Sequence, residues 1–435
     1  MLNYYDNHNK DKRHFSRLLL VTVAPLSLFL ILLLLPSDNA MIPEVKIVPT
    51  NAAASTLDMA YAISPSASVL SSTSNENCIS YDSSARVITI RCKSASVTDL
   101  DNQINDDSIL TKQSSNGIWL LDAGILVDKG AVLNIDSNDV KWLRIAADGT
   151  SVNAIDVLGG LRIDSVKLTS WNPNKNDYAS SNGTRDLHDN KVVNGDPRPY
   201  IRVDDEATGT TNITNSEIAY LGYESGVGGG KTGLRYDGGS GSILIGNNIH
   251  NLYFGLYSSG VGGMIIENNQ IHHNSHYGFD PHTGTHDMIF RNNTVHDNGG
   301  IGFICSLDCH HIVIEKNKIY DNAKRGIMFS RNMSDSIARN NIIDKEEHAI
   351  TISESHNNEI YNNRISNSEG GIDIDKESSN NAIHNNTIIV ADKAHSQVQA
   401  SSSSDAISVE EGAEKNNKIY SNTIINDDSG KNVNQ

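Results

Sequence analysis

The sequence predicts an all-β protein, a right-handed parallel β-helix in which short strands wind into a solenoid. Asparagine pairs, or an equivalent with one asparagine, recur from residue 247 onward at steps of 21, 24, 24, 24, 22 and 23 residues. Between them recurs a second motif with a central small residue: Phe254-Gly255-Leu256, Tyr277-Gly278-Phe279, Ile301-Gly302-Phe303, Arg325-Gly326-Ile327, His348-Ala349-Ile350 and Gly370-Gly371-Ile372. A period in the low twenties, with β-rich segments and no helical pattern, is typical of a solenoid whose coils stack at roughly 4.8 Å.

The asparagine pairs are predicted to serve the fold. They fall at Asn247-Asn248, Asn268-Asn269, Asn292-Asn293, Lys316-Asn317, Asn340-Asn341, Asn362-Asn363 and Asn385-Asn386. Asparagine tolerates turn backbone, and its amide can stack on an equivalent amide along the axis. The glycines of the second motif are likewise expected to serve turns.

The strand after each central small residue should alternate between core and solvent. The inward positions are apolar apart from one cysteine: Leu256, Phe279, Phe303, Ile327, Ile350 and Ile372, then Pro281, Cys305, Phe329, Ile352 and Ile374. The positions between them form two outward columns. The first column is Arg235, Tyr257, Asp280, Ile304, Met328, Thr351 and Asp373, and the second is Asp237, Ser259, His282, Ser306, Ser330, Ser353 and Asp375.

One coil breaks this repeat. Only the segment Tyr277–His282 carries Asp-Pro-His where its neighbours carry ordinary strand residues. A proline within a stacked strand removes a ladder hydrogen bond, and such local rule-breaking favours a functional site. We expect Asp280 and His282 to share an exposed face, with Tyr277 and Arg325 just before their strands. The face should be flanked by Arg235 and Tyr257 on one side and by Arg325 and Arg331 on the other.

The N-terminus predicts a targeting segment. Basic residues precede an apolar run at 18–35, which favours a secretory signal or an uncleaved signal anchor within residues 1–40. Residues 41–75, rich in Ala, Ser and Thr, are expected to be a linker. The protein should therefore be extracellular or held at the cell envelope, and touch a membrane only through this segment.

Residues 76–113 are expected to form a small N-terminal β cap. Cys78 and Cys92 bracket two strand-like runs around a polar turn, which indicates a hairpin closed by a disulfide in an oxidising compartment. Cys305 and Cys309 leave two alternatives open, a free core cysteine or a second disulfide across the following turn. Residues 114–430 should form the β-helix, with a loop at 172–198.

Composition narrows the partners. The 435-residue chain has a net charge of −17, which argues against nucleic acid because a phosphate-binding surface needs a basic face. A polyanionic substrate is compatible only if the few cations gather along one groove. His272, His273 and His276 could suggest a metal, but we interpret them as turn histidines and expect no metal site. A monomer is expected.

The Tyr-Gly-Phe-Asp-Pro-His segment, followed by a continued parallel β-helix, resembles the mannuronan C5-epimerases of alginate biosynthesis. The resemblance is strongest over residues 230–390. It implies that His282 is the catalytic base, Tyr277 the proton relay and Asp280 the carboxylate that supports them. It also implies an anionic polysaccharide as substrate, with no required cofactor and Ca²⁺ as an option.

The sequence departs from this family at one position. Periplasmic epimerases place an Arg at the end of the next coil's strand, where this chain has Leu307. The secreted type has an Asp near this place, and the nearest here is Asp308. A uronate carboxylate gathers charge as the C5 proton leaves, so cations must hold it. The cationic candidates for holding the carboxylate are therefore Arg235, Lys231, Arg325 and Arg331. Tyr257 and Asp308 complete the candidate substrate-binding residues.

Two alternatives share these features. A β-elimination lyase acting on a uronate polymer needs nearly the same acid, base and cationic groups. A non-catalytic extracellular polysaccharide-binding β-helix would keep the scaffold without the reaction, and the missing Arg favours that interpretation.

Overall fold

A computed structural model describes residues 78–149, 152–181, 184–185, 192–193, 196–225, 231–375, 377–390, 406–413, 416–426 and 432–434. The predicted targeting segment and linker lie outside these residues. The chain divides into two units, Met1–Ser74 and Asn75–Gln435, and all described residues belong to the second. Within the described part of the chain, no helix is both long enough and apolar enough to span a membrane.

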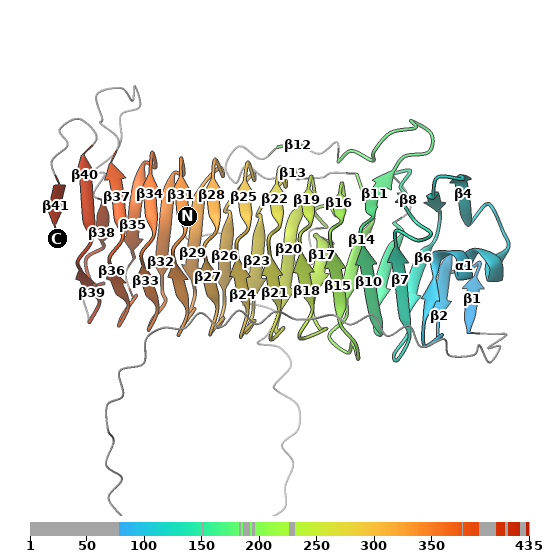
Figure 1. The fold of residues 1–435 in the computed structure, drawn as a ribbon, viewed down its shortest axis with the longest axis horizontal. Helices are drawn as coiled ribbons and strands as arrows, with labels where there is room; N and C mark the ends of the chain where they lie inside the picture. Colours follow the sequence, from blue (N-terminus) through green and yellow to red (C-terminus); the bar gives the residue numbers. More distant parts are fainter. Residues whose placement is uncertain are drawn as a thin grey trace, which may run out of the picture. The chain divides into compact units, whose positions relative to one another are not determined.

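The described residues form a right-handed parallel β-helix, as predicted, in which three sheets wind around one apolar core (Figure 1). The first sheet carries the residues of interest. Its strands, in spatial order, are β1 (Ile79–Asp82), β2 (Val87–Ile90), β6 (Gly124–Val127), β9 (Ala154–Val157), β14 (Tyr200–Val203), β17 (Gly233–Tyr236), β20 (Phe254–Ser259), β23 (Phe279–His282), β26 (Phe303–Ser306), β29 (Arg325–Ser330), β32 (His348–Ser353), β35 (Gly370–Ile374) and β38 (Ile407–Val409).

The second sheet follows the first in each coil. Its strands are β3 (Ala95–Ser96), β7 (Val132–Asp136), β10 (Gly160–Asp164), β15 (Thr211–Thr214), β18 (Ile243–Ile245), β21 (Ile265–Glu267), β24 (Ile289–Arg291), β27 (Val313–Glu315), β30 (Ile337–Arg339), β33 (Glu359–Tyr361), β36 (Ala382–His384) and β39 (Lys418–Tyr420).

The third sheet completes the coil. Its strands are β4 (Leu110–Ser114), β5 (Ile118–Leu121), β8 (Trp142–Ala146), β11 (Lys167–Trp171), β16 (Glu217–Ala219), β19 (Asn248–His250), β22 (Gln270–His272), β25 (Thr294–His296), β28 (Lys318–Tyr320), β31 (Ile342–Asp344), β34 (Arg364–Ser366), β37 (Thr387–Val390), β40 (Thr423–Asn426) and β41 (Asn432–Asn434). A separate pair, β12 (Thr184–Arg185) and β13 (Val192–Val193), lies in the predicted loop region.

The N-terminal residues start these sheets. Strands β1 and β2 form an antiparallel hairpin, and a disulfide joins Cys78 to Cys92. Strand β2 then pairs in parallel with β6, so the hairpin extends the first sheet. Helix α1 (Val97–Ile104) begins with a capping box between Ser96 and Asp99, which satisfies amide groups that its first turn leaves unpaired. A second disulfide joins Cys305 to Cys309, the alternative that the sequence left open.

A ladder of buried asparagines runs between the second and third sheets. The backbone N and side-chain Nδ2 of each ladder residue before Asn422 donate to the Oδ1 of its equivalent on the next coil, with N···Oδ1 distances of 2.9–3.2 Å. Its members are Asn247, Asn269, Asn293, Asn317, Asn341, Asn363, Asn386 and Asn422. The residue before each ladder asparagine has positive φ wherever the sequence predicted a pair, for example 55° at Asn292. This confirms the structural role predicted for the pairs.

The first predicted pair is out of register. Strand pairing aligns Asn248 with Gln270, and the N–H of Asn247 donates to Asn269. The structural equivalent of Asn268-Asn269 is therefore Gly246-Asn247. Gly246 has a φ of 71°, so glycine takes the left-handed position that asparagine takes on later coils.

Replacing a ladder asparagine should destabilise the solenoid. Asn293→Ala removes the acceptor for two donors of Asn269 and the donor to the carbonyl of Ile266. Because these groups are buried, we expect a loss of about 2–4 kcal/mol in denaturant melts. Asn292→Gly, at the adjacent left-handed position, is the control and should change stability by less than about 0.5 kcal/mol. Equal effects of the two substitutions would contradict the ladder's role.

Candidate functional site

Strand β23 lies near the middle of the first sheet, between β20 and β26 (Figure 1). The register confirms both outward columns here, because Tyr257 pairs with Asp280 and His282 pairs with Ser259 and Ser306. Pairing between β23 and β26 is recorded only at Phe279 and His282. The gap spans Pro281, which has no N–H to donate.

His282 is held at both ring nitrogens. Its Nδ1 lies 2.6 Å from Oγ1 of Thr283, and its Nε2 lies 3.3 Å from Nη2 of Arg331. A guanidinium can only donate, so Nε2 must accept, and the neutral ring then carries its proton on Nδ1 and donates to Thr283. The ring also stacks on Tyr257, with centroids 5.7 Å apart. His282 therefore presents a lone pair at Nε2.

Nδ1 of His282 contacts the hydroxyl of Thr283. The supporting role that the resemblance assigns to Asp280 stays a prediction. Sequence reasoning overlooked Thr283, although it directly follows the histidine.

Asp280 is buried, which corrects the prediction of an exposed carboxylate. Only 5% of the residue is accessible, and its Oδ1 has no hydrogen-bond partner among the described residues. The outward position is covered because Tyr257 on one coil and Ile304 on the next are both bulky and buried themselves. Burial raises the pKa of Asp280 to about 8, while Arg331 acts in the opposite direction. The carboxyl is therefore mostly protonated at neutral pH.

Arg331 reaches His282 across two coils. The N–H of Thr283 donates to Ser306, and the N–H of Leu307 donates to Ser330. Thr283, Leu307 and Arg331 thus occupy equivalent positions on successive coils. The long Arg331 side chain extends back past Leu307 to the imidazole. Leu307 stands where the resemblance predicts an arginine. Arg331, one coil beyond Leu307, contacts His282.

Arg235 and Tyr257 form the other side of the site. The guanidinium of Arg235 lies 4.8 Å from the ring centroid of Tyr257, and its Nε donates to Asp237 at 2.5 Å. Burial raises the pKa of Tyr257, and Asp280 adds to the effect, so this phenol stays neutral.

Tyr277 belongs to an aromatic cluster beside these residues. Its ring stacks on His276 at 3.8 Å and lies 5.2 Å from Phe254, which in turn lies 6.2 Å from Tyr257. The rings therefore run without a break from His276 to His282. Phe254 and His276 were not among the predicted site residues. The signal for Phe254 was available, since it occupies the position of Tyr277 in the preceding repeat.

Three of the predicted substrate-binding residues contact residues other than His282 and Tyr257. Nε of Arg325 donates to Oγ1 of Thr351 at 3.0 Å, toward the C-terminal coils, and Arg325 is the first residue of β29 rather than a residue before it. The ammonium of Lys231 lies 5.4 Å from the ring centroid of Tyr223. Asp308 lies on an exposed turn and accepts from Asn332 at 2.6 Å.

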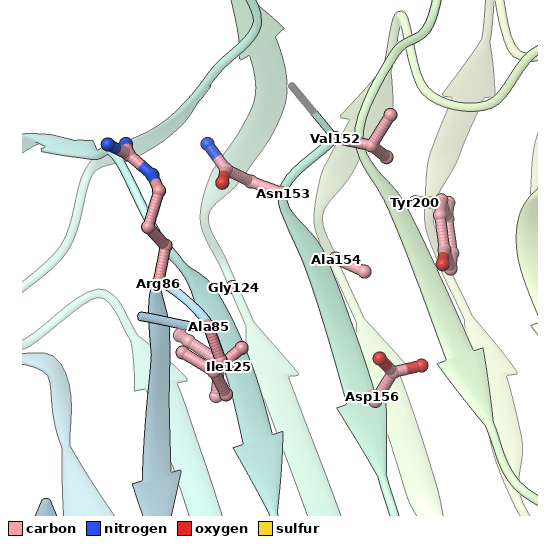
Figure 2. A pocket seen from close by; sticks show the side chains of 10 residues that line it. Ala85, Arg86, Gly124, Ile125, Val152, Asn153, Ala154, Asp156 and Tyr200 are labelled. Carbon is pink, nitrogen blue, oxygen red and sulfur yellow. The ribbon is translucent and has the colours of Figure 1, made fainter. Parts of the chain in front are cut away.

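A pocket of about 240 Å³ opens on the same sheet nearer the N-terminus, where Arg86, Asn153, Asp156 and Tyr200 line one space (Figure 2). Its charges are matched: Arg86 pairs with Asp122 and Asp156 pairs with Arg202, each at 2.9 Å. None of the residues predicted for catalysis lines it. The pocket therefore lies apart from the residues predicted for catalysis.

The fold and this site define a right-handed parallel β-helix with histidine, arginine and aromatic residues gathered on one sheet. A family model described as "Periplasmic copper-binding protein (NosD)" matches residues 189–392 and 304–435, together more than half of the chain. The chain belongs to this family. The two matches overlap over 304–392, as expected when a model follows a repeat that recurs along the chain.

The chain is similar to two solved structures, the first of which shares its fold. The crystal structure titled "periplasmic alginate epimerase AlgG" is 20% identical, covers 78% of this chain and 85% of its own, and has a TM-score of 0.62. The A-module of Azotobacter vinelandii mannuronan C-5 epimerase AlgE4 is 15% identical over 71% of this chain and 84% of its own, with a TM-score of 0.47. No curated protein sequence matches the chain.

The burial of Asp280 predicts a stability difference that depends on pH. Its folded pKa of about 8 lies above the ordinary value of 3.8. Below about pH 4 both states hold the proton, whereas between pH 4 and 8 only the unfolded chain ionises, which favours unfolding. Asp280→Asn should therefore match the parent protein at pH 3.5 and exceed it by a few kcal/mol at pH 8, since each pKa unit is worth about 1.4 kcal/mol.

Denaturant melts at the two pH values check this. The Asp308→Asn protein is the control, because that residue lies on an exposed turn. A parent protein that stays as stable as Asp280→Asn at pH 8 would show that the carboxyl is ionised in the folded state.

Proposed function

We propose that the protein is a polyuronate C5-epimerase that converts mannuronate to guluronate residues in an alginate-like polysaccharide. The observation that carries the proposal is the contact between His282 and Arg331, because it joins a base to a carboxylate-binding group. His282 ends the segment that resembles the mannuronan epimerases. The likeness to the alginate epimerase AlgG supports the scaffold.

His282 acts as the base in this proposal. Its Nε2 carries the lone pair, since Nδ1 donates to Thr283. A base positioned at C5 removes the carbon-bound proton and contributes on the order of 10²–10⁴ in rate. Arg331 covers Nε2 in the free protein, so a substrate that draws the guanidinium onto its own carboxylate uncovers the base.

Arg331 binds the uronate carboxylate. Negative charge builds on that carboxylate as the C5 proton leaves, and a preorganised guanidinium stabilises it. The site of this arginine differs from that of periplasmic epimerases, which carry it at the position of Leu307. Arg331 lies one coil further on and reaches the same histidine.

Asp280 and Tyr277 complete the proposed reaction. A protonated Asp280 brings no negative charge toward the substrate carboxylate. Tyr277 returns a proton to C5 from the opposite face, as the resemblance implies. The aromatic cluster around Tyr277 and Tyr257 offers apolar surface to the sugar rings.

Export fits the same proposal. The disulfides Cys78–Cys92 and Cys305–Cys309 support an oxidising compartment, outside the cell or in its envelope. The pocket lined by Tyr200 lies on the same sheet as His282, so a long polymer that follows this sheet would reach it beyond the reacting sugar.

The family description also names copper. Among the described residues, His273, His296 and Asp297 could hold a metal ion, and two imidazoles with a carboxylate are acceptable copper ligands. A copper ion bound there would join two coils. No step of the epimerisation is assigned to it, because the proposed base, relay and carboxylate-binding groups are all protein side chains.

Incubation with polymannuronate in deuterated water tests the proposed reaction. We expect deuterium at C5 and a rise in guluronate content, both measured by NMR. New unsaturated ends that absorb in the ultraviolet would establish a lyase instead. Binding without either change would favour the polysaccharide-binding alternative.

Substitutions test the proposed roles. His282→Ala should abolish turnover while the fold persists by circular dichroism, because His282 faces away from the core. Arg331→Ala should lower kcat more than it raises KM, since its contact strengthens as charge develops. Arg325→Ala is the matched control, because its contact is to Thr351, and it should affect turnover much less. Near-normal epimerisation by the His282→Ala protein would contradict the mechanism.

A further inference from the structure

A group of histidine and aspartate side chains lies on the turns that leave the third sheet, away from the first sheet. His273 follows strand β22 and Asp297 follows strand β25, one coil further on. His296, His273 and Asp297 each offer a ligand atom, and these atoms lie within 4.8 Å of one another. They form the one such group of three among the described residues.

The coil register explains this convergence. His272 pairs with His296, so the next residues, His273 and Asp297, are neighbours on adjacent turns. Both have left-handed backbone, with φ of 54° and 52°, which turns their side chains in the same way. His273 and Asp297 are 24 residues apart in sequence. The group therefore cannot be found by considering only neighbouring residues such as His272, His273 and His276.

Further contacts hold the side chains in place. Nδ1 of His296 lies 2.7 Å from Oδ2 of Asp297, and the ring of His296 stacks on His272 with centroids 4.8 Å apart. Nδ1 of His273 lies 2.7 Å from Nδ1 of His272. These contacts limit the rotamers of His273 and His296, so less side-chain entropy is lost when an ion binds.

We propose that His273, His296 and Asp297 bind a divalent first-row transition ion, Cu²⁺ or Zn²⁺, between two coils. Neutral imidazole nitrogens and a carboxylate oxygen suit these ions, and water can complete the coordination. Asp321 takes the position of Asp297 on the next coil and pairs with Lys345 at 3.8 Å. The proposal is independent of the epimerase activity.

A bound ion would link two adjacent coils at His273, where the segment that leads to strand β23 begins. Asn274, directly after His273, donates from its backbone and side chain to Asn298 on the next coil. Two residues later His276 stacks on Tyr277. A metal bound at His273 would reinforce the coil-to-coil contacts of this segment and raise the protein's thermal midpoint.

The chain supplies a matched control group. His286 and His311 contact Asp287 at 2.8 and 3.4 Å on another turn of adjacent coils. This group has the same composition of two histidines and one aspartate. It does not bring three ligand atoms within reach of one ion, as His273, His296 and Asp297 do.

Calorimetric titration with CuCl₂ and with ZnCl₂ tests the proposal, using the full chain without a histidine tag. We expect His273→Ala and the conservative Asp297→Asn each to weaken the tightest binding event by about 10-fold or more, the range seen when even outer-shell partners are lost. His311→Ala and Asp287→Asn should leave it unchanged. Electron paramagnetic resonance of the Cu²⁺ complex should show coupling to two imidazole nitrogens, reduced to one in His273→Ala.

Two results would overturn the proposal. One is metal binding that the His273 and Asp297 variants do not weaken although circular dichroism shows them folded. The other is an equal loss in the control variants, which would mean that exposed histidines bind metal without a defined site. An increase in thermal midpoint with metal that persists in Asp297→Asn would likewise count against it.

Discussion

The buried asparagine ladder is the interaction on which the rest of the structure depends. After the first ladder residue, each ladder side chain donates to a backbone carbonyl of the coil before, as Asn293 does to Ile266, and accepts two hydrogen bonds from that coil, as Asn317 does from Asn293. Neighbouring coils are therefore held in register. Register determines which side chains meet across coils. Tyr257, Asp280 and His282 face one another only because β20 and β23 keep this alignment. A shift of one residue would turn Asp280 and His282 toward the core.

A site built on stacked coils assembles its groups from different repeats. The proposed base, the buried carboxyl and the rings of Phe254 and Tyr257 come from β20 and β23, whereas the guanidinium comes from the turn after β29. A long side chain can span two coils of roughly 4.8 Å each. A guanidinium can therefore contact a histidine from two coils away, and a comparison made position by position does not reveal such a contact.

The β-helix and its outward columns could be predicted because they depend on period alone. Strand alternation and the repeat length align His282 with Ser306 whatever the neighbouring residues are. The burial of Asp280 could not be predicted in this way, since it depends on the bulk of Tyr257 and Ile304. The contact of Arg331 depends on side-chain reach, and the contact of Thr283 on local rotamers. His273 and Asp297 are neighbours in space but 24 residues apart in sequence, so their proximity follows only from the register of the coils.

The most direct test of this account is a crystal structure of the His282→Ala protein with a mannuronate oligomer bound. The account predicts that a uronate carboxylate lies about 3 Å from the Arg331 guanidinium, within hydrogen-bond reach, and that C5 of the same sugar faces residue 282. An oligomer whose carboxylate is held by Arg325 or Lys231, or one bound away from the first sheet, would contradict it.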